Sequence, residues 1–426
     1  MIQNNYDAIL KEMFGLQRFG IKLGLATIRN ILRGLGNPHR TYTCIHIAGT
    51  NGKGSIAAGM ASILGQAGYR TGLYTSPHLI DFNERISING QQISNQEVVD
   101  AYQAVKEVHH GSREPTFFEF TTAMALYEFG RQKVDWAIIE TGMGGRLDAT
   151  NIIHPAVSVI SNISLEHKMY LGNTIAQIAA EKGGIIKSKT PAITGTRQHS
   201  ALSVLQSIAA SKSAPLYRYG HDFRVRTNAN GSFNYYGLSN EWKNLKTSLI
   251  GPHQIKNAAL ALAACETLAL KKQIAITEAH LGEGLQKTIW PGRLEFVGDA
   301  PLIILDGAHN LAAARNLAKF LRENLRNRKL TLVAGILDDK PYKAMLRPLM
   351  KQCSRIIVTR PLIDRALEPE ILYAEARQHV ADVTRMPDVD QAVTRALETA
   401  DPDDVICVAG SLYVVGEAKQ TLARLL

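Results

Sequence analysis

The segment of this 426-residue chain best suited to chemistry is HIAGTNGKGS, residues 46–55. It follows a short apolar run and precedes an apolar helical pattern, a setting in which backbone N–H groups and a helix N-terminus bind phosphate. It departs from the template G-x-x-x-x-G-K-[ST], because Ile47 replaces the first glycine and Gly54 separates Lys53 from Ser55. We therefore expect a variant phosphate-binding loop; the alternative is a glycine turn with a surface lysine. The loop residues are Gly49, Thr50, Asn51, Gly52, Lys53, Gly54 and Ser55.

Two acidic residues follow other apolar runs. Glu140 ends one run within IIETGMGGRLDATN, residues 138–151, and Glu166 and His167 follow another. Since ligands bind beyond the carboxyl ends of parallel strands, these side chains are candidates for a metal site. The glycines of 138–151 could instead imitate a dinucleotide fingerprint, but Leu147 occupies the third glycine position. His167 alone would suggest packing; beside a second acid and a phosphate loop, packing and metal binding stay equally open.

A lysine lies on the apolar side of a predicted helix. Ile175, Ile178 and Lys182 are spaced i, i+3 and i+7, which puts Lys182 on the stripe that faces the core. One interpretation is a lysine whose amine extends back to solvent. The other is a buried amine with a lowered pKa, open to modification or metal binding.

Further polar and aromatic residues lie in turns. Ser76 and His78 belong to the loop 75–86, and 117–123 offers aromatic rings that could stack on a flat ligand or simply pack in the core. The segments GPHQIKN (251–257), WPGRLE (290–295), DGAHN (306–310) and GSLY (410–413) put polar residues at the ends of predicted elements. Taken together, these segments predict a site in a cleft between two domains.

The elements that position these residues alternate between strand and helix. TCIHIAGT, VDWAIIET and AVSVISNI are typical of buried parallel strands, and helical patterns separate them. The sequence predicts an α/β fold with an N-terminal P-loop-type doubly wound parallel sheet, a small β insert at 221–250, and a C-terminal Rossmann-like α/β domain. We place the linker in WPGRLEFVGDAP, residues 290–301, and the domains at 1–296 and 297–426.

Composition narrows the class of protein. No apolar run of about 18 residues occurs and the N-terminus does not resemble a secretory signal, so we expect a cytoplasmic protein without a membrane partner. Four cysteines form no CxxC pair, which disfavours zinc and a disulfide scaffold. The net charge of +10 is dispersed, which suits small polyanions or a solvated basic surface rather than nucleic acid.

Eight motifs occur together in register: GTNGKGS, TSPHL, GGRLDATN, EKGGIIK, GPHQIKNA, WPGRLE, DGAHN and GSLYVVGE. On these motifs the chain resembles the folylpolyglutamate synthase/dihydrofolate synthase family, within the Mur ligase superfamily. The resemblance implies a bifunctional, monomeric enzyme that uses ATP to add L-glutamate to dihydropteroate and to reduced folates through an acyl phosphate, releasing ADP and phosphate. The alternatives are a monofunctional member, a Mur-type ligase of UDP-sugar peptides, a dinucleotide-dependent oxidoreductase, or a non-enzymatic binding module.

The resemblance also implies residue roles. The loop 49–55 would hold the ATP phosphates, with Lys53 on the transferred group, and two magnesium ions are expected. The implied metal ligands are Ser76, Glu140, His167 and Lys182, the last as an N6-carboxylated lysine, and Lys53, Glu140, His167 and Lys182 are the implied catalytic residues. Nucleotide contacts are implied for Asn257, Arg293, Asp306 and His309, and substrate contacts for His78, Phe118, Asp148, Ala149, His309 and Ser411.

Some positions depart from the family pattern. Glu166 stands where an aspartate is common, which moves the carboxylate by one methylene. Gly183, Leu311 and Pro341 replace a frequent alanine, proline and acid, respectively. Because none of these changes falls on Lys53, Glu140 or His167, we expect activity.

Overall fold

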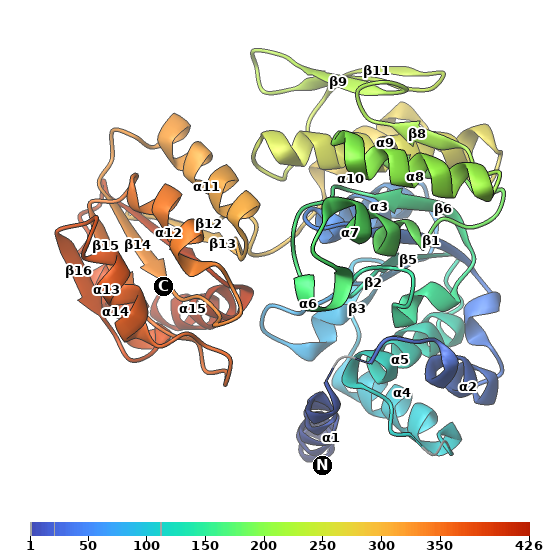
Figure 1. Ribbon diagram of the computed structural model, residues 1–426, viewed down its shortest axis with the longest axis horizontal. Coiled ribbons are helices and arrows are strands. Elements are labelled where there is room, and N and C mark those ends of the chain that lie inside the picture. Colours follow the sequence, from blue (N-terminus) through green and yellow to red (C-terminus); the bar gives the residue numbers. More distant parts are fainter. Residues whose placement is uncertain (1, 21, 111–112) are drawn as a thin grey trace. The chain divides into compact units, whose positions relative to one another are not determined.

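The computed structural model describes residues 2–20, 22–110 and 113–426, which form two compact units (Figure 1). The first unit comprises residues up to His78, Phe82–Ser248 and Gln254–Ile289. The second comprises Leu79–Asp81, Leu249–His253 and Trp290–Leu426. The domain limits expected from the sequence, 1–296 and 297–426, stay a prediction.

The first unit is built on an eight-stranded sheet with the order β4-β3-β2-β5-β1-β6-β7-β8. Its strands are β1 (Thr43–Ala48), β2 (Thr71–Tyr74), β3 (Ile86–Ile88), β4 (Gln91–Gln92), β5 (Trp136–Glu140), β6 (Pro155–Ile160), β7 (Ala192–Thr194) and β8 (Leu216–Arg218). The pairs from β2 to β8 are parallel, and only β3 and β4 add antiparallel pairs at one edge. The carboxyl ends of the central strands therefore lie at one edge of the sheet.

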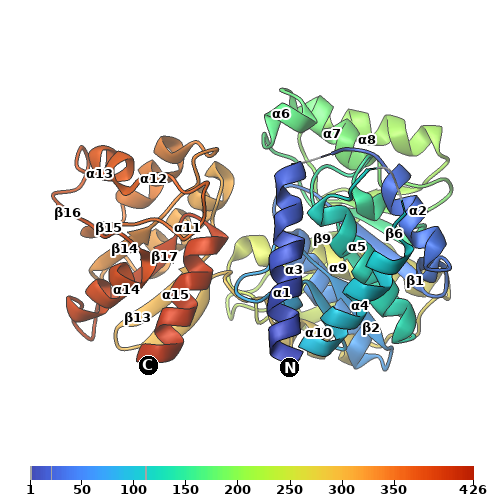
Figure 2. The same cartoon turned by 90° about the horizontal axis from the view of Figure 1, so that it is seen from below.

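Both faces of this sheet are covered, which explains why its strands read as continuous apolar runs. Along β5, Trp136 and Ile138 pack into the core with α3, α9 and α10, whereas Ala137 and Ile139 pack with α1, α2, α4 and α5. Figure 2 shows α1, α4 and α5 together on this second side. The helices are α1 (Ile2–Gly15), α2 (Ala26–Gly34), α3 (Lys53–Gln66), α4 (Asn95–Val108), α5 (Phe117–Arg131), α6 (Lys168–Leu171), α7 (Ile175–Gly183), α8 (His199–Ser211), α9 (Pro252–Leu270) and α10 (Glu278–Gln286), with 3-10 turns η1 (Leu16–Phe19), η2 (Pro38–Arg40), η3 (Phe82–Arg85) and η4 (Ala149–Ile152).

Local sequence fixes where several helices begin. Ser94, Thr116 and Thr174 each accept a hydrogen bond from the backbone three residues later, and a side chain there bonds back. These capping boxes satisfy backbone donors that the first helical turn leaves unpaired. The predicted β insert is confirmed as a three-stranded antiparallel sheet of β9 (Arg224–Thr227), β10 (Phe233–Tyr236) and β11 (Glu241–Leu245).

The second unit holds a six-stranded sheet with the order β12-β13-β17-β14-β15-β16, parallel except for β12. Its core lies on both faces, with α11, α12 and α13 on one side and α14 and α15 on the other. The elements are β12 (Glu295–Asp299), β13 (Leu302–Asp306), α11 (Leu311–Asn324), β14 (Leu330–Ala334), α12 (Tyr342–Met350), β15 (Arg355–Val358), α13 (Pro369–Ala376), β16 (Asp382–Arg385), α14 (Val389–Glu398), β17 (Val405–Ala409) and α15 (Leu412–Leu425). Two α/β units with a small β insert confirm the predicted fold class.

The segment expected to be a linker contains a strand. Residues 295–299 form β12, which pairs with β13 across a register shift between Phe296 and Gly298. Pro, Gly and Asp residues in and around this short strand indicated a turn in the sequence. Because edge strands tolerate such residues, a strand can form there nevertheless. In the described part of the chain, no helix is both long and apolar enough to cross a membrane.

Candidate active site

The glycine-rich loop joins β1 to α3. Gly52 precedes the helix with φ 88° and Gly49 has φ 148°, both in the region that favours glycine. A Cβ on Gly49 would lie 1.8 Å from the Ser161 Oγ, and one on Gly52 would lie 2.5 Å from the Asn257 Oδ1. Both glycines are therefore needed for the backbone to pass these side chains. The loop residues Gly54 and Ser55 lie in the first turn of α3, whose N-terminus is the phosphate-binding end of a helix.

Residues just after β6 hold this loop in place. Asn162 accepts a hydrogen bond from the Asn51 N–H at 3.0 Å and donates one to the Asn51 carbonyl at 3.1 Å. Ser161 Oγ donates to that same carbonyl at 2.7 Å, and the Thr50 hydroxyl accepts from the Ser164 N–H at 3.0 Å. Ser161, Asn162 and Ser164 were not among the residues predicted from the sequence, although they follow β6 at the carboxyl edge of the sheet, where functional groups gather.

Lys53 and Glu140 lie together at the carboxyl edge of the sheet. The Lys53 Nζ lies 3.7 Å from the Glu140 Oε1, and the Ser76 backbone N–H donates to the other carboxylate oxygen at 3.3 Å. Glu140 is buried, whereas Lys53 is partly exposed. β1 and β5 are neighbours in the sheet, and Ile47 pairs with Glu140 in their register. The expectation that strand ends would bring these residues together is met in the geometry.

Lys182 is buried beneath the loop. Its side chain is 2% exposed, and its amine donates to the Gly49 carbonyl at 2.8 Å and to the Glu166 Oε1 at 2.7 Å. The interpretation of a lysine that extends to solvent is therefore wrong. Burial lowers the pKa of Lys182, and the charge of Glu166 opposes that shift. For Glu166, burial alone would raise the pKa, but the charges of Lys182 and Lys53 outweigh it and lower the pKa.

Two further predicted residues of the first unit, Asn257 and His167, differ in their exposure to solvent. Asn257, on α9, is buried against Gly52 and donates to the Gln254 Oε1 at 2.8 Å. His167 is exposed and has φ 44° at the start of the short helix α6. Because the His167 side chain is exposed, it does not pack in the core, and its imidazole is accessible to a ligand.

The predicted residues of the second unit lie at the carboxyl ends of β13 and β17. Asp306 pairs in register with Ala409, the residue two before Ser411. The Asp306 carboxylate accepts from the Leu294 N–H at 2.9 Å, and burial raises its pKa against the opposing charge of Arg293. Arg293 donates to the Gly307 carbonyl at 3.1 Å.

Two remaining residues of this group contact their own loops. The His309 Nδ1 lies 2.8 Å from the Gly307 carbonyl oxygen, so this nitrogen carries the hydrogen in that contact. Ser411 is buried and caps α15, since its Oγ accepts from the Val414 N–H at 3.1 Å. The Ser411 side chain therefore has a structural role whatever it contacts besides.

Comparison with known proteins agrees with this geometry. Residues 47–265 match the Mur ligase middle domain, and residues 292–412 match the Mur ligase glutamate ligase domain. A Bacillus subtilis protein named dihydrofolate synthase/folylpolyglutamate synthase is 36% identical over 430 residues, covering 98% of this chain and 99% of its own length. The chain belongs to the folylpolyglutamate synthase/dihydrofolate synthase family.

Two solved structures of the family carry ligands. E. coli FolC, in complex with DHPP and ADP, is 29% identical, covers 98% of both chains and superposes with a TM-score of 0.90. A bifunctional folylpolyglutamate synthase/dihydrofolate synthase with Mn, AMPPNP and L-glutamate bound is 30% identical, covers 97% of this chain and 98% of its own, and has a TM-score of 0.87. The Mur ligase-like description of both units is thereby confirmed.

His78 belongs to a cluster of aromatic rings in the first unit. Its ring lies 6.2 Å from Phe14 and 6.3 Å from Phe82 between centroids, and Phe14 stacks on Phe117 at 5.5 Å. Arg85 donates to the His78 Nδ1 at 2.8 Å. Burial, with the Arg85 charge, lowers the pKa of His78 to about 3, so this imidazole is neutral. Phe14, Phe82 and Arg85 were not named from the sequence: Phe14 comes from α1, far along the chain, whereas Phe82 and Arg85 lie in the loop 75–86 itself and could have been found there.

The other predicted substrate residues have internal contacts. The Asp148 carboxylate accepts from the Met143 N–H at 2.8 Å, the Thr150 N–H at 3.0 Å and the Thr150 hydroxyl at 2.5 Å, and it caps η4, where the buried Ala149 begins. A Cβ on Gly142 would lie 2.5 Å from the Phe118 ring, so that ring packs on the loop that Asp148 shapes. Asp148 is therefore bound to its own loop in this structure.

The donor set of the first unit suits magnesium in a family that uses nucleotides. No group of three His, Cys, Asp or Glu side chains able to hold a metal exists within residues 2–20, 22–110 and 113–426. Mg²⁺ needs no such group where phosphates complete its coordination, since one or two carboxylates are enough. Buried Glu140, beside Lys53 and the loop, offers such a carboxylate. The residues present fit a magnesium ion shared with a nucleotide.

Proposed function

We propose that this chain is an ATP-dependent ligase that adds L-glutamate to dihydropteroate, making dihydrofolate, and to reduced folates, making polyglutamates. The observation that carries this proposal is the contact of Lys53 with Glu140 at 3.7 Å beside a helix N-terminus, in a chain whose family membership spans nearly its whole length. Phosphate-binding backbone, a cation and a carboxylate at one strand edge are the parts that phosphoryl transfer requires. The complexes of the E. coli and AMPPNP-bound relatives support ATP, a divalent metal and small-molecule substrates.

The chemistry proceeds in two steps. The substrate carboxylate attacks the γ-phosphorus of ATP, and an acyl phosphate and ADP result. The glutamate amine then attacks the acyl carbon, and the tetrahedral adduct collapses with loss of phosphate. The first step develops negative charge on the transferred group, and Lys53 with the N–H groups of 49–55 would stabilise that charge. Formation of the amide is driven by the conversion of ATP to ADP.

The metal sites are part of this proposal. Ser76, Glu140, His167 and an N6-carboxylated Lys182 would hold two magnesium ions. When bound, magnesium would supply positive charge that offsets the charge of the nucleotide phosphates. Carboxylation makes Lys182 anionic, so it would have to replace the present ion pair with Glu166. Glu166 would then turn away from Lys182, which the longer side chain of a glutamate allows.

The remaining roles follow the same proposal. Asn257 and Arg293 would contact the nucleotide, and Asp306 and His309 would serve the nucleotide and the incoming glutamate. His78, Phe118, Asp148, Ala149 and Ser411 would contact the other substrates. The protein would act as a cytoplasmic monomer without a membrane partner, and its dispersed charge favours small molecules over nucleic acid as its substrates.

A direct experiment tests the activity. ADP release is measured with purified protein, ATP, magnesium and L-glutamate, with dihydropteroate and with tetrahydrofolate as alternative acceptors. We expect release that depends on glutamate and on each acceptor. Release with one acceptor alone would identify a monofunctional enzyme, and release with neither would contradict the proposal.

A further inference from the structure

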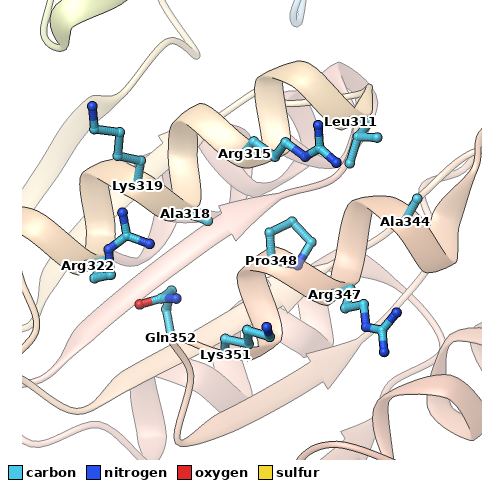
Figure 3. Close-up of a pocket in the computed structure, with 10 residues that line it drawn as sticks. All are labelled: Leu311, Arg315, Ala318, Lys319, Arg322, Ala344, Arg347, Pro348, Lys351 and Gln352. Atoms are coloured by element: carbon cyan, nitrogen blue, oxygen red, sulfur yellow. The ribbon is translucent and has the colours of Figure 1, made fainter.

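A pocket lies between α11 and α12 of the second unit, and none of the roles above uses it. Its volume is about 540 Å³, within the range of small-molecule sites. Figure 3 shows the lining side chains on the two helices and just after the end of α12. All of its lining residues belong to the second unit.

Positive charge dominates the lining. On α11, Arg315, Lys319 and Arg322 are spaced i, i+4 and i+7, so they share one face of the helix. Arg347 of α12 and Lys351, just after that helix, form a second pair at i, i+4. No aspartate or glutamate lines the pocket among the described residues. The two rows therefore present five cations to one space.

These cations are poorly neutralised by the protein. Within the described ranges, Arg315, Arg347 and Lys351 form no salt bridge. Lys319 and Arg322 approach Glu323, at 3.9 and 3.8 Å, and all three side chains are exposed. Exposed pairs at such distances contribute little, so the mutual repulsion of the cations persists until an anion binds.

The pocket is not uniformly polar. Leu311, Ala318, Ala344 and Pro348 contribute apolar surface between the charged rows. Pro348 lies inside α12 and has no N–H, so the Ala344 carbonyl lacks its α-helical donor. A matching ligand carries several anionic groups on an aliphatic chain and offers N–H donors. Inorganic phosphate has the charge but neither the chain nor the donors.

A γ-linked glutamate chain has all three features. Each link keeps one free α-carboxylate, two methylene groups and one amide N–H. We propose that the α11–α12 pocket binds the oligo-γ-glutamate tail of folate polyglutamates. This inference rests on the proposed function, which makes that chain as its product. Leu311, at one end of the pocket, directly follows the DGAHN segment 306–310, to which we assign the incoming glutamate.

Binding in this pocket would favour long acceptors. Each added glutamate brings one more carboxylate to the cationic rows, so affinity rises with tail length and falls with salt. An acceptor without a tail gains nothing from the pocket. The enzyme would therefore retain polyglutamylated acceptors while it treats dihydropteroate independently of these cations.

The test compares two triple variants of the full chain. Arg315→Gln, Arg347→Gln and Lys351→Gln remove unpaired cations of the pocket. Arg29→Gln, Lys271→Gln and Arg326→Gln form the matched control, since these residues are exposed and lie outside the pocket. Binding of a pterin-free penta-γ-glutamate peptide carrying a fluorophore is measured by anisotropy at low and physiological salt. The same titration is repeated with di-γ-glutamate and with a single-stranded RNA oligomer.

We expect the pocket variant to bind penta-γ-glutamate about tenfold more weakly than wild type, since each exposed ion pair contributes a factor of about two. The control variant should bind as wild type does, and ADP release with dihydropteroate should be unchanged in both. Equal loss in both variants, affinity independent of tail length, or tighter binding of RNA would overturn the proposal. Because the peptide carries no pterin and its binding needs no turnover, failure of the ligase assay is a separate result.

Discussion

The two groups of predicted site residues, one in each unit, are held in different ways. In the first unit, charged side chains contact one another: Lys53 lies 3.7 Å from Glu140, and Lys182 lies 2.7 Å from Glu166. In the second unit, polar side chains contact backbone atoms. Asp306 accepts from the Leu294 N–H, and Ser411 accepts from the Val414 N–H.

This difference separates two kinds of contribution. A charged side chain that faces an opposite charge at the carboxyl edge of the sheet can bind a substrate that takes the place of its partner. Removing such a side chain should lower turnover more than stability. A side chain bound to a backbone N–H orders a loop or a helix end, and losing it affects stability as well. Substitutions in the two units should therefore divide between turnover and unfolding.

The largest effect is expected at Lys53. Lys53→Ala removes the cation from the phosphate loop, and we expect ATP-dependent turnover to fall about 10³-fold, because charge that develops on the transferred group loses its stabilisation. ADP release with dihydropteroate and glutamate measures this, while thermal unfolding should change little. Lys271→Ala, at an exposed site, is the control. ADP release near the wild-type rate would refute the phosphate role.

A smaller loss is expected at Lys182. Lys182→Ala should lower turnover about 10²-fold, because a removed group that acts on the metal or its ligands is worth roughly that much. Added short carboxylic acids should restore part of the activity, since they can occupy the space of a carboxylated amine.

Lys187→Ala supplies the control for this rescue. Lys187 is a partly buried lysine near Lys182 in the sequence, and its amine donates to the Asn151 carbonyl at 3.0 Å. If Lys187→Ala loses activity, added short carboxylic acids should not restore it. Unchanged activity in Lys182→Ala itself would contradict the proposed carboxylation.

The sequence indicated which polar residues lie together more clearly in the first unit than in the second, for a physical reason. The strand pattern puts Glu140 at the end of β5 and the loop that leads to Lys53 directly after β1, and the pairing of these neighbouring strands brings the two residues together. The partners Ser161 and Asn162 and the ring of Phe14 depend on how distant segments pack, which local patterns do not encode. The strand at 295–299 was missed because turn residues surround it.

At Asp306 we expect a loss of turnover of intermediate size together with unchanged or increased stability. Asp306→Asn keeps an acceptor for the Leu294 N–H but removes the charge, so turnover should fall about tenfold. Burial raises the folded-state pKa of Asp306 above its unfolded value. Its ionisation therefore costs stability as pH rises above about 4, the ordinary value for aspartate. Urea unfolding should show the variant at least as stable as wild type at pH 7, with a smaller advantage at pH 4; a less stable, fully active variant would assign Asp306 to structure alone.

The smallest effect on turnover is expected at Ser411. Ser411→Ala removes the cap of α15, and the free energy of unfolding should fall by about 1 kcal/mol, while turnover stays within about threefold. Asp388→Ala is the matched control, because Asp388 caps α14 through the Gln391 N–H at 2.8 Å and belongs to neither group of site residues. Similar stability losses in both variants, measured by urea unfolding, would assign Ser411 to the scaffold. A rise in the KM for glutamate of about tenfold without loss of stability would instead make Ser411 a substrate contact, and the contrast between the two units would then not extend to this residue.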